Sequence, residues 1–357
     1  MWIGIDDTDA PGGGCTTFVL TEILRAARSV GADLLGEPRL VRLDPNIPWK
    51  TRGNAALAAH FGRGTGERRR LGELPDGTVW SHARGRPLLA PTGRRLLDAA
   101  WEVVERTSVR ARGTDPALVA CARRPPTSLY RSAVRSVVRV ADVDRLLRSL
   151  GASVRVRGSR RGIVGAAAAL AWPARRVTWE LIAYRAPSET AARRAVDPES
   201  VREVERRHPQ LFQCTDPRTR RVLISPHTAC PILFGLRSTD PSVLPGAMRE
   251  IRSEAVERWV VFRTNQATGD HLTDRAIGDL EPYGSGRFLG TVASLPERRR
   301  GGHVRFVLAD RLGERLACLA FEPTKTLPKV AASLVPGDRV EVWGGRGRDA
   351  TLRLEGI

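Results

Sequence analysis

The first seventeen residues constrain the fold more than any other stretch. A short apolar run, Trp2 to Ile5, predicts a buried strand, and three carboxylates follow it within four residues: Asp6, Asp7 and Asp9. A Pro-Gly-Gly-Gly loop comes next, and its backbone can approach a phosphate closely. From Thr16 the pattern predicts a helix that continues to about residue 30. Together these features predict a site for a metal ion and a polyphosphate: a strand, an acidic cluster, a glycine loop and a helix that begins with hydroxyl side chains.

Each part of this stretch also has an ordinary structural explanation. Aspartates after a strand often form turns, and threonine is a common helix N-cap. The loop lacks the Lys-Ser/Thr ending of a P-loop, so the spacing does not match that familiar nucleotide site.

Length and composition limit the class of protein. A chain of 357 residues predicts two to three domains, and 41% apolar residues suffice for ordinary cores. The apolar runs are too short for a membrane span, and Met1 leads directly into a strand, so we expect no signal peptide and a cytoplasmic protein. The five cysteines are scattered without a Cys-x-x-Cys pair, which favours neither a disulfide framework nor a zinc site.

The net charge of +19 indicates a polyanionic partner, most simply RNA or DNA. Only three of the 58 basic residues are lysines, namely Lys50, Lys325 and Lys329. An arginine preference alone does not raise net charge, so the excess of base over acid needs its own explanation. Lysines that survive in such a chain are candidates for positions that require a compact ammonium group.

Three further segments carry basic or glycine-rich patterns. Lys50, Thr51, Arg52, Gly53 and Asn54 place cations, a hydroxyl and an amide around a glycine, which suits phosphates or a base edge, or else forms a basic surface loop. Residues 62–90 are rich in Gly and Arg and predict a loop region or a hairpin. Arg160 and Arg161 precede a glycine-containing, alanine-rich helix, a second candidate anion site.

The middle of the chain predicts mixed helices and strands. We expect helices over 91–109, 142–150, 198–207 and 241–253, and strands over 39–43, 55–61, 177–185 and 259–263. Lone His227 and Cys230 are either packed or ligating. The polar run 264–272 has too many hydrogen-bonding groups for a plain connector, so it lines a site or an interdomain joint.

From about residue 285 the pattern changes to five short strands. They cover 288–292, 304–308, 316–321, 339–343 and 352–354, with a helical stretch over 323–334 before the fourth. This outline predicts an OB-fold, which often binds oligonucleotides.

Several motifs, in order along nearly the whole chain, resemble the archaeal agmatinylcytidine synthetases of isoleucine tRNA. They are Ile3-Gly4-Ile5-Asp6-Asp7-Thr8-Asp9, Cys15-Thr16-Thr17, residues 38–43, residues 50–54, residues 180–185, Gly235-Leu236-Arg237, residues 264–268 and residues 321–325. The resemblance implies an α+β multidomain protein with a kinase-like α/β domain, a ferredoxin-like α+β domain and a C-terminal OB-fold β-barrel. We place these domains at 1–128, 129–275 and 283–357.

The resemblance also implies a reaction. ATP phosphorylates the 2-carbonyl oxygen of the wobble cytidine, and the amine of agmatine then displaces phosphate. A threonine of the family, matched here by Thr16, is itself phosphorylated. We therefore expect Thr16, Asp6, Asp7 and Asp9 to be catalytic, with Asp7 and Asp9 holding Mg²⁺.

The remaining site residues are candidates for binding the substrates of this reaction. ATP would be bound by Lys50, Thr51, Arg52, Gly53 and Asn54, and RNA by Lys325, Arg160 and Arg161. A guanidinium substrate needs a carboxylate or carbonyl partner, for which the candidates are Glu180, Tyr184, Cys230 and Gly235.

The sequence departs from the family in two places. Members usually continue into a four-cysteine zinc ribbon, whereas no cysteine follows Cys318 here, and Gly269 separates the 264–268 motif from Asp270. The main prediction is thus an ATP-dependent ligase that couples agmatine to tRNA. The alternatives are the same chemistry on a small-molecule amide or pyrimidine, and a non-catalytic RNA-binding protein.

Overall fold

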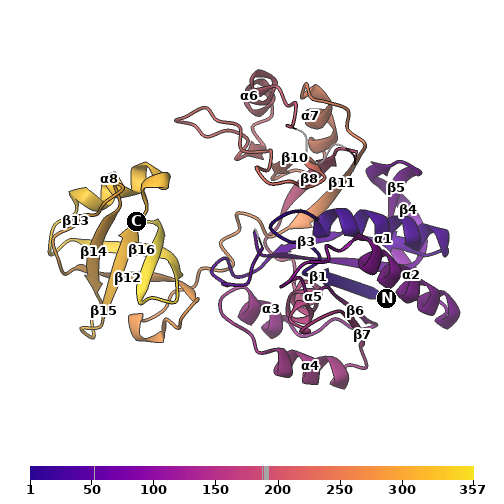
Figure 1. The fold of residues 1–357 in the computed structure, drawn as a ribbon, viewed down its shortest axis with the longest axis horizontal. Helices are drawn as coiled ribbons and strands as arrows, with labels where there is room; N and C mark the ends of the chain where they lie inside the picture. The colour runs from indigo at the N-terminus through magenta and orange to yellow at the C-terminus, as the bar shows by residue number, and fades with distance from the viewer. Residues whose placement is uncertain (52, 187, 189–192) are drawn as a thin grey trace. The chain divides into compact units, whose positions relative to one another are not determined.

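The computed structural model describes every residue except 52, 187 and 189–192, and it divides into two compact units. The first unit comprises residues 1–42, 55–130 and 139–268, and the second comprises 43–54, 131–138 and 269–357. Figure 1 shows the helices and strands of each. Within the described residues, no helix is both long and apolar enough to cross a membrane. All five cysteines are buried free thiols.

The first unit is built on one eleven-stranded sheet. Its main path runs β7-β6-β1-β4-β3-β11-β8-β10-β9, and β2 and β5 extend from β4. The strands are β1 (Trp2–Asp6), β2 (Asp33–Leu35), β3 (Arg39–Arg42), β4 (Ala55–Leu74), β5 (Gly77–Arg86), β6 (Ala117–Cys121), β7 (Ser153–Val156), β8 (Thr178–Tyr184), β9 (Leu211–Phe212), β10 (Ile232–Ser238) and β11 (Arg258–Thr264).

Seven helices of the described chain belong to this unit or to the connection that leaves it. They are α1 (Thr16–Ser29), α2 (Ala90–Thr107), α3 (Thr127–Ala133), α4 (Val140–Ser149), α5 (Gly162–Ala171), α6 (Pro198–Arg207) and α7 (Leu244–Glu250). The predictions for α1, α2, α4, α6, β3, β8 and β11 are confirmed to within two residues. The predicted helix over 241–253 is shorter, and the predicted strand over 55–61 continues to Leu74 as half of a long hairpin with β5.

Alternation along β1 places helices on both of its faces (Figure 1). Ile3 and Ile5 point into a core formed with α1 and α2, where their side chains are fully buried. Gly4 points the other way, toward α5, and a Cβ at Gly4 would overlap the carbonyl oxygen of Ala166. The backbone of α5 therefore lies directly against β1. Its many small residues, all of them buried, permit this approach.

The same alternation divides the cores along β8. Leu181 and Ala183 pack with α6 and α7 in a separate core, whereas Ile182 and Tyr184 pack into the core of α1. Strand β8 thus links two cores that lie on opposite faces of one continuous sheet. Because of this arrangement, the side chain of Tyr184 reaches the helix that starts at Thr16.

The second unit contains a closed five-stranded barrel. Its strands are β12 (Ser285–Val292), β14 (Val304–Ala309), β15 (Arg315–Ala320), β16 (Arg339–Arg346) and β17 (Thr351–Gly356), and a short β13 (Glu297–Arg298) extends β14. The order β12-β16-β17-β15-β14 closes through the β12–β14 pair. A short helix η3 (Glu322–Thr324) and α8 (Thr326–Ser333) lie before the fourth barrel strand. The five predicted strands and their helix are therefore confirmed.

Replacing Gly4 by alanine is expected to destabilise the protein. The new methyl group would overlap a backbone carbonyl of α5, which cannot move away as a flexible side chain can, so we expect a loss of about 1–3 kcal/mol in the free energy of unfolding. Gly93→Ala on α2 is the matched control, because a Cβ there meets no atom within 4 Å. Urea unfolding of both variants measures the difference, and equal stabilities would contradict the close approach of α5 to β1.

Candidate functional site

The acidic cluster lies where β1 ends. Asp7 has a left-handed backbone (φ 57°), which turns the chain sharply out of the sheet. The Asp6 carboxylate lies against α5, and a Cβ at Gly165 would collide with its Oδ2. Burial, and then the nearby charges of Asp7 and Asp9, raise the pKa of Asp6 well above its ordinary range. The glycine in α5 is therefore what makes room for a buried carboxyl group at the end of the strand.

Asp7 belongs to a second group of charges that the sequence did not connect. Its carboxylate accepts a hydrogen bond from the backbone N–H of Asp115, and it interacts with the charge of Arg161. Burial raises the pKa of Asp7 to about 6, while Arg161 acts in the opposite direction. Arg161 was predicted to bind RNA; it lies in the acidic cluster, and its RNA role stays a prediction.

Asp115 holds the loop that precedes α5. Its Oδ1 accepts from the backbone N–H of Ser159 at 2.8 Å, its Oδ2 accepts from the Ser159 hydroxyl, and Arg161 Nη2 lies 3.0 Å from Oδ2. Burial opposes ionisation of Asp115, yet the hydrogen bonds from Ser159 outweigh it and lower the pKa. Gly158 has φ +88°, and a Cβ there would collide with Asp115. Position 115 could not be found from sequence because its partners lie more than forty residues away.

A tight turn brings the start of α1 back to β1. The backbone groups of Ala10 and Gly13 exchange two hydrogen bonds of 2.9 and 3.0 Å. Gly14 follows with φ +78°, packed against Asp9. The result is that the Thr8 hydroxyl donates to the Thr16 hydroxyl at 3.0 Å, and both side chains are buried. The predicted proximity of the acidic strand end and Thr16 is therefore present.

Cys15, Thr17 and Tyr184 meet beside Thr16. The Cys15 thiol and the Thr17 hydroxyl lie 2.9 Å apart. The Tyr184 phenol is fully buried, and burial raises its pKa well above the ordinary value, with Cys15 adding to the shift and Thr17 opposing it. Its hydroxyl makes no hydrogen bond of good geometry within the described residues. A buried phenol hydroxyl without a well-formed hydrogen bond is a candidate contact for a polar ligand.

Glu180, a predicted amine ligand, is already held by two arginines. Arg42 Nη2 lies 3.2 Å from Oε2 and Arg237 Nε lies 3.3 Å from Oε1, while the Glu180 side chain is only 5% exposed. Gly235, another predicted ligand, lies beside this carboxylate, because a Cβ there would be 3.0 Å from Oε1. The geometry brings Glu180 and Gly235 together, and their contact with an amine stays a prediction.

Cys230 lies in a turn organised by an arginine that sequence reasoning missed. Arg194 donates to the carbonyl oxygens of Pro226, Thr228, Cys230 and Ile232, and its Nη2 is 3.3 Å from the Cys230 sulfur. The buried thiol is thus part of a packed turn. His227 is hydrogen-bonded to Arg221.

Asn265 explains the polar run after β11. Its side chain accepts from Arg42 N–H at 2.7 Å and donates to Arg42 C=O at 2.9 Å and to the Tyr130 hydroxyl at 2.8 Å. Thr178 and Thr268 bind the backbone of the same run. These groups fix the end of β3 against the end of β11.

The remaining predicted residues lie elsewhere. Lys50, Thr51, Gly53 and Asn54 belong to the second unit, where Lys50 donates to the Pro45 carbonyl and Asn54 donates to that of Asp44 at 2.9 Å; Arg52 lies outside the described residues. Lys325, also in the second unit, forms an exposed ion pair with Glu322 at 2.5 Å. Arg160 pairs with Asp144 at 2.6 Å on the surface. The ATP and RNA roles of these residues stay predictions.

Among the described residues, no group of three or more His, Cys, Asp or Glu side chains converges on a metal position. The donors at the end of β1 are nevertheless hard carboxylate oxygens. Burial first, and neighbouring carboxylates second, raise the pKa values of Asp6 and Asp7, and a nearby cation would favour their ionised forms. One or two carboxylates together with substrate phosphates are the usual ligands of Mg²⁺. The residues therefore fit a magnesium ion that arrives with a nucleotide.

The fold and this site define a class of protein. Carboxylates and hydroxyls gathered at the end of a central strand, beside two glycine-containing loops, are typical of α/β proteins that handle phosphate groups.

Comparison with known proteins gives the particular family. The family model described as the TiaS TCKD domain matches residues 2–157, and that of the TiaS FLD domain matches residues 160–271. The chain therefore belongs to the TiaS family.

Curated relatives and solved structures agree with this membership. TiaS of Methanopyrus kandleri, a 2-agmatinylcytidine synthetase of isoleucine tRNA, is 39% identical over 96% of this chain and 75% of the relative. That of Methanosarcina acetivorans is 34% identical over 99% and 79%. A crystal structure of TiaS in complex with isoleucine tRNA and ATP matches with a TM-score of 0.86 at 31% identity, covering 99% of this chain and 79% of that one. A TiaS mutant without its zinc ribbon domain (ZRD), crystallised with agmatine, matches with a TM-score of 0.77 at 26% identity. The match covers 99% of this chain and 87% of that one.

The raised pKa of Asp7 predicts how the free energy of unfolding of the metal-free protein depends on pH. The folded state keeps a proton on this group up to about pH 6, whereas the unfolded state, with the ordinary value of 3.8, has released it. The contribution of Asp7 to the free energy of unfolding therefore falls as pH rises between about 4 and 6. We expect Asp7→Asn to gain stability relative to wild type across this window, and the gain to level off above it.

Urea unfolding at several pH values, with a chelator present, measures this difference. Asp142→Asn, which removes a half-exposed carboxylate at the start of α4, is the matched control for loss of a negative charge. A stability difference for Asp7→Asn that stays constant from about pH 4 to pH 7 would show that the group is not held in its protonated form.

Proposed function

We propose that the chain is a 2-agmatinylcytidine synthetase of isoleucine tRNA, an ATP-dependent ligase that joins agmatine to the wobble cytidine of that tRNA. The observation that carries the proposal is the buried Thr8–Thr16 hydroxyl pair beside the Asp6 and Asp7 carboxylates, in a chain that relatives of this name match along almost its full length. The reaction places the protein in the cytoplasm, where tRNA is found.

The chemistry has two steps. The γ-phosphoryl group of ATP passes to the 2-carbonyl oxygen of cytosine, which releases ADP and turns an inert oxygen into a leaving group. The amine of agmatine then attacks C2, the C–O bond breaks, and phosphate leaves with that oxygen. In addition, ATP phosphorylates the Thr16 hydroxyl. A bound Mg²⁺ would neutralise charge on the phosphates, with Asp7 and Asp9 as its ligands.

The residues of this chain have separate parts in that proposal. Asp6 fills the space beside Gly165 at the strand end, where burial raises its pKa well above the ordinary range. Thr8 holds the Thr16 hydroxyl at the carboxylate edge through a 3.0 Å hydrogen bond. The buried Tyr184 hydroxyl is a candidate contact for the amine substrate, since it lies beside Cys15 and Thr17.

Domain labels finer than the observed architecture also belong to this proposal. The order β11-β8-β10-β9, antiparallel throughout with α6 and α7 in the connections, supports a ferredoxin-like domain, because it matches a βαββαβ unit with its first and third strands in the centre. A five-stranded barrel with a helix before its fourth strand supports the OB-fold label. The sheet around β1 with α1 and α2, within residues 1–128, would be the kinase-like domain, and α5 from the following range packs against it.

Transfer of label from γ-labelled ATP tests the phosphoryl-transfer core. We expect wild type to become labelled and Thr16→Val to lose at least 90% of the label, since valine has no hydroxyl to phosphorylate (about tenfold or more, or 1.4 kcal/mol). Ser29→Ala is the control, because it removes an exposed hydroxyl from the other end of α1.

Adding agmatine and an isoleucine tRNA transcript with a wobble cytidine decides the substrate. A mass gain on the tRNA is the expected result. Labelled protein without any modified tRNA would favour the same chemistry on a small molecule, and ATP that persists unchanged would favour a non-catalytic RNA-binding protein.

A further inference from the structure

The β4–β5 hairpin carries a concentration of positive charge that the proposed reaction does not use. Six arginines lie on it, at 63, 68, 69, 70, 84 and 86, against three acidic residues, Glu67, Glu73 and Asp76. All six arginine side chains are exposed. So dense a cluster of one sign costs stability through repulsion unless a partner neutralises it.

Only two of these arginines form ion pairs with described residues. Arg69 contacts Glu37 at 2.5 Å, and Arg70 contacts Glu73 at 2.7 Å. The other four, Arg63, Arg68, Arg84 and Arg86, form no ion pair with any described residue. The strand register places Arg63 directly opposite Arg86, an arrangement of like charges that is unfavourable in an isolated sheet.

An aromatic side chain lies within this cluster. Trp80 is 39% exposed, and the guanidinium of Arg68 stacks on its ring at 4.4 Å from the centroid. A tryptophan and an arginine plane on a basic strand pair are the side chains on which unpaired nucleobases stack.

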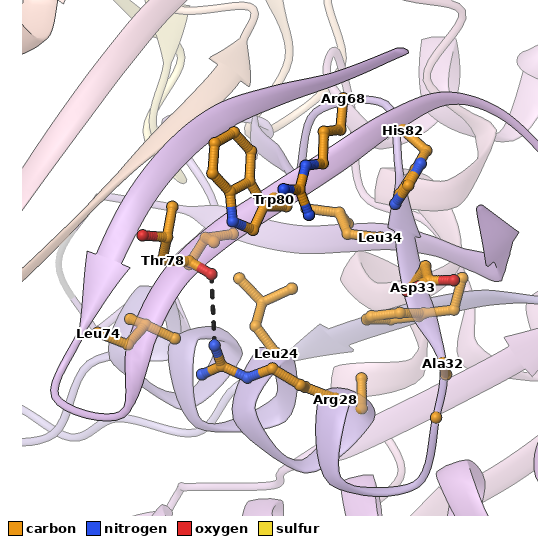
Figure 2. A pocket seen from close by; sticks show the side chains of 14 residues that line it. Leu24, Arg28, Ala32, Asp33, Leu34, Arg68, Leu74, Thr78, Trp80 and His82 are labelled. Carbon is orange, nitrogen blue, oxygen red and sulfur yellow. Dashed lines mark hydrogen bonds between the residues drawn. The ribbon is translucent and has the colours of Figure 1, made fainter. Parts of the chain in front are cut away.

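Beneath Trp80 lies a cavity of about 300 Å³ (Figure 2). Its lining mixes apolar side chains, among them Leu24 and Leu34, with polar ones, and Asp33 and His82 lie at the same end (Figure 2). The His82 Nδ1 atom is buried and makes no hydrogen bond within the described residues. The cavity therefore combines apolar and polar lining groups with an unsatisfied ring nitrogen, which suits a nitrogen heterocycle.

The charges disfavour a cationic ligand for this cavity. Its one carboxylate, Asp33, already accepts a hydrogen bond from Gly64 N–H at 2.7 Å, and Arg28 donates to the Thr78 carbonyl across the cavity. A ligand with phosphates outside and a base inside would match the arginines, the exposed tryptophan and the cavity together.

We propose that the β4–β5 hairpin is an RNA-binding element: Arg63, Arg68, Arg84 and Arg86 contact backbone phosphates, and the cavity beneath Trp80 holds one unpaired base. The inference rests on the proposed function in taking RNA as the partner, and it adds a contact surface outside the acidic cluster. Arg84 and Arg86 set the salt dependence of binding, whereas Trp80 sets the preference for an unpaired base.

The first arm of the test measures the affinity for the isoleucine tRNA transcript over a range of salt concentrations. Arg84→Gln/Arg86→Gln is compared with Arg206→Gln/Arg249→Gln, which removes the same charge from exposed positions on α6 and α7. Loss of two phosphate contacts is expected to reduce the slope of log affinity against log salt by about 1.4, since each contact on a single strand is worth about 0.7. The control is expected to keep the wild-type slope.

The second arm separates stacking from charge. Trp80→Ala is expected to bind the transcript about tenfold more weakly with an unchanged salt slope, and Trp80→Phe to restore most of the affinity, because phenylalanine still offers a flat ring. A fully paired RNA duplex is expected to bind wild type and Trp80→Ala equally. Thermal unfolding of every variant establishes that it is folded.

The outcomes distinguish this proposal from the reaction. If wild type modifies the tRNA and the arginine pair variant binds like its control, the hairpin proposal is wrong and the enzyme proposal stands. If wild type binds no RNA at any salt concentration, both are wrong. A reduced slope for Arg84→Gln/Arg86→Gln together with a base-dependent loss for Trp80→Ala establishes the hairpin as the contact surface.

Discussion

The close approach of α5 to β1 is the constraint on which the candidate site depends. Gly4 lets the helix backbone reach the strand, and Gly165 leaves the space that the Asp6 carboxylate fills. Because α5 is fixed there, the loop before it brings Ser159 and Arg161 to Asp115, and Asp115 in turn reaches Asp7. A side chain at either glycine would push α5 away from β1. Arg161 and Asp7 would then no longer lie close together.

Like charges gather at two places in this protein, one buried and one exposed. At the end of β1, carboxylates are buried close together, so their pKa values rise and the site is prepared for a cation and its phosphates. On the β4–β5 hairpin, exposed arginines outnumber the acidic residues, and four of the six form no ion pair with a described residue. Both arrangements cost free energy in the isolated protein, and in both a ligand of opposite charge would recover it.

Much of the fold was predictable because its signals are local. Period-3.6 patterns identified α1, α2, α4 and α6, and short alternating runs identified the barrel strands. Strand β6 was missed, since Ala117–Cys121 is buried on both faces and shows no alternation. Residues 62–90 were predicted as a loop region or a hairpin, because the Gly- and Arg-rich half of β4 lacks the apolar pattern of a core strand, and the hairpin is the alternative that is present.

The sequence by itself determined which groups gather at the end of β1: three carboxylates, a glycine loop and Thr16 lie between residues 6 and 16, so chain connectivity keeps them close. Tertiary structure decided everything that depends on distant partners. Asp115 and Arg161 lie beside Asp7. The Glu180 carboxylate contacts Arg42 and Arg237. Arg63 faces Arg86 across a hairpin. These contacts follow from sheet register and helix packing, which bring together side chains that no spacing along the chain relates.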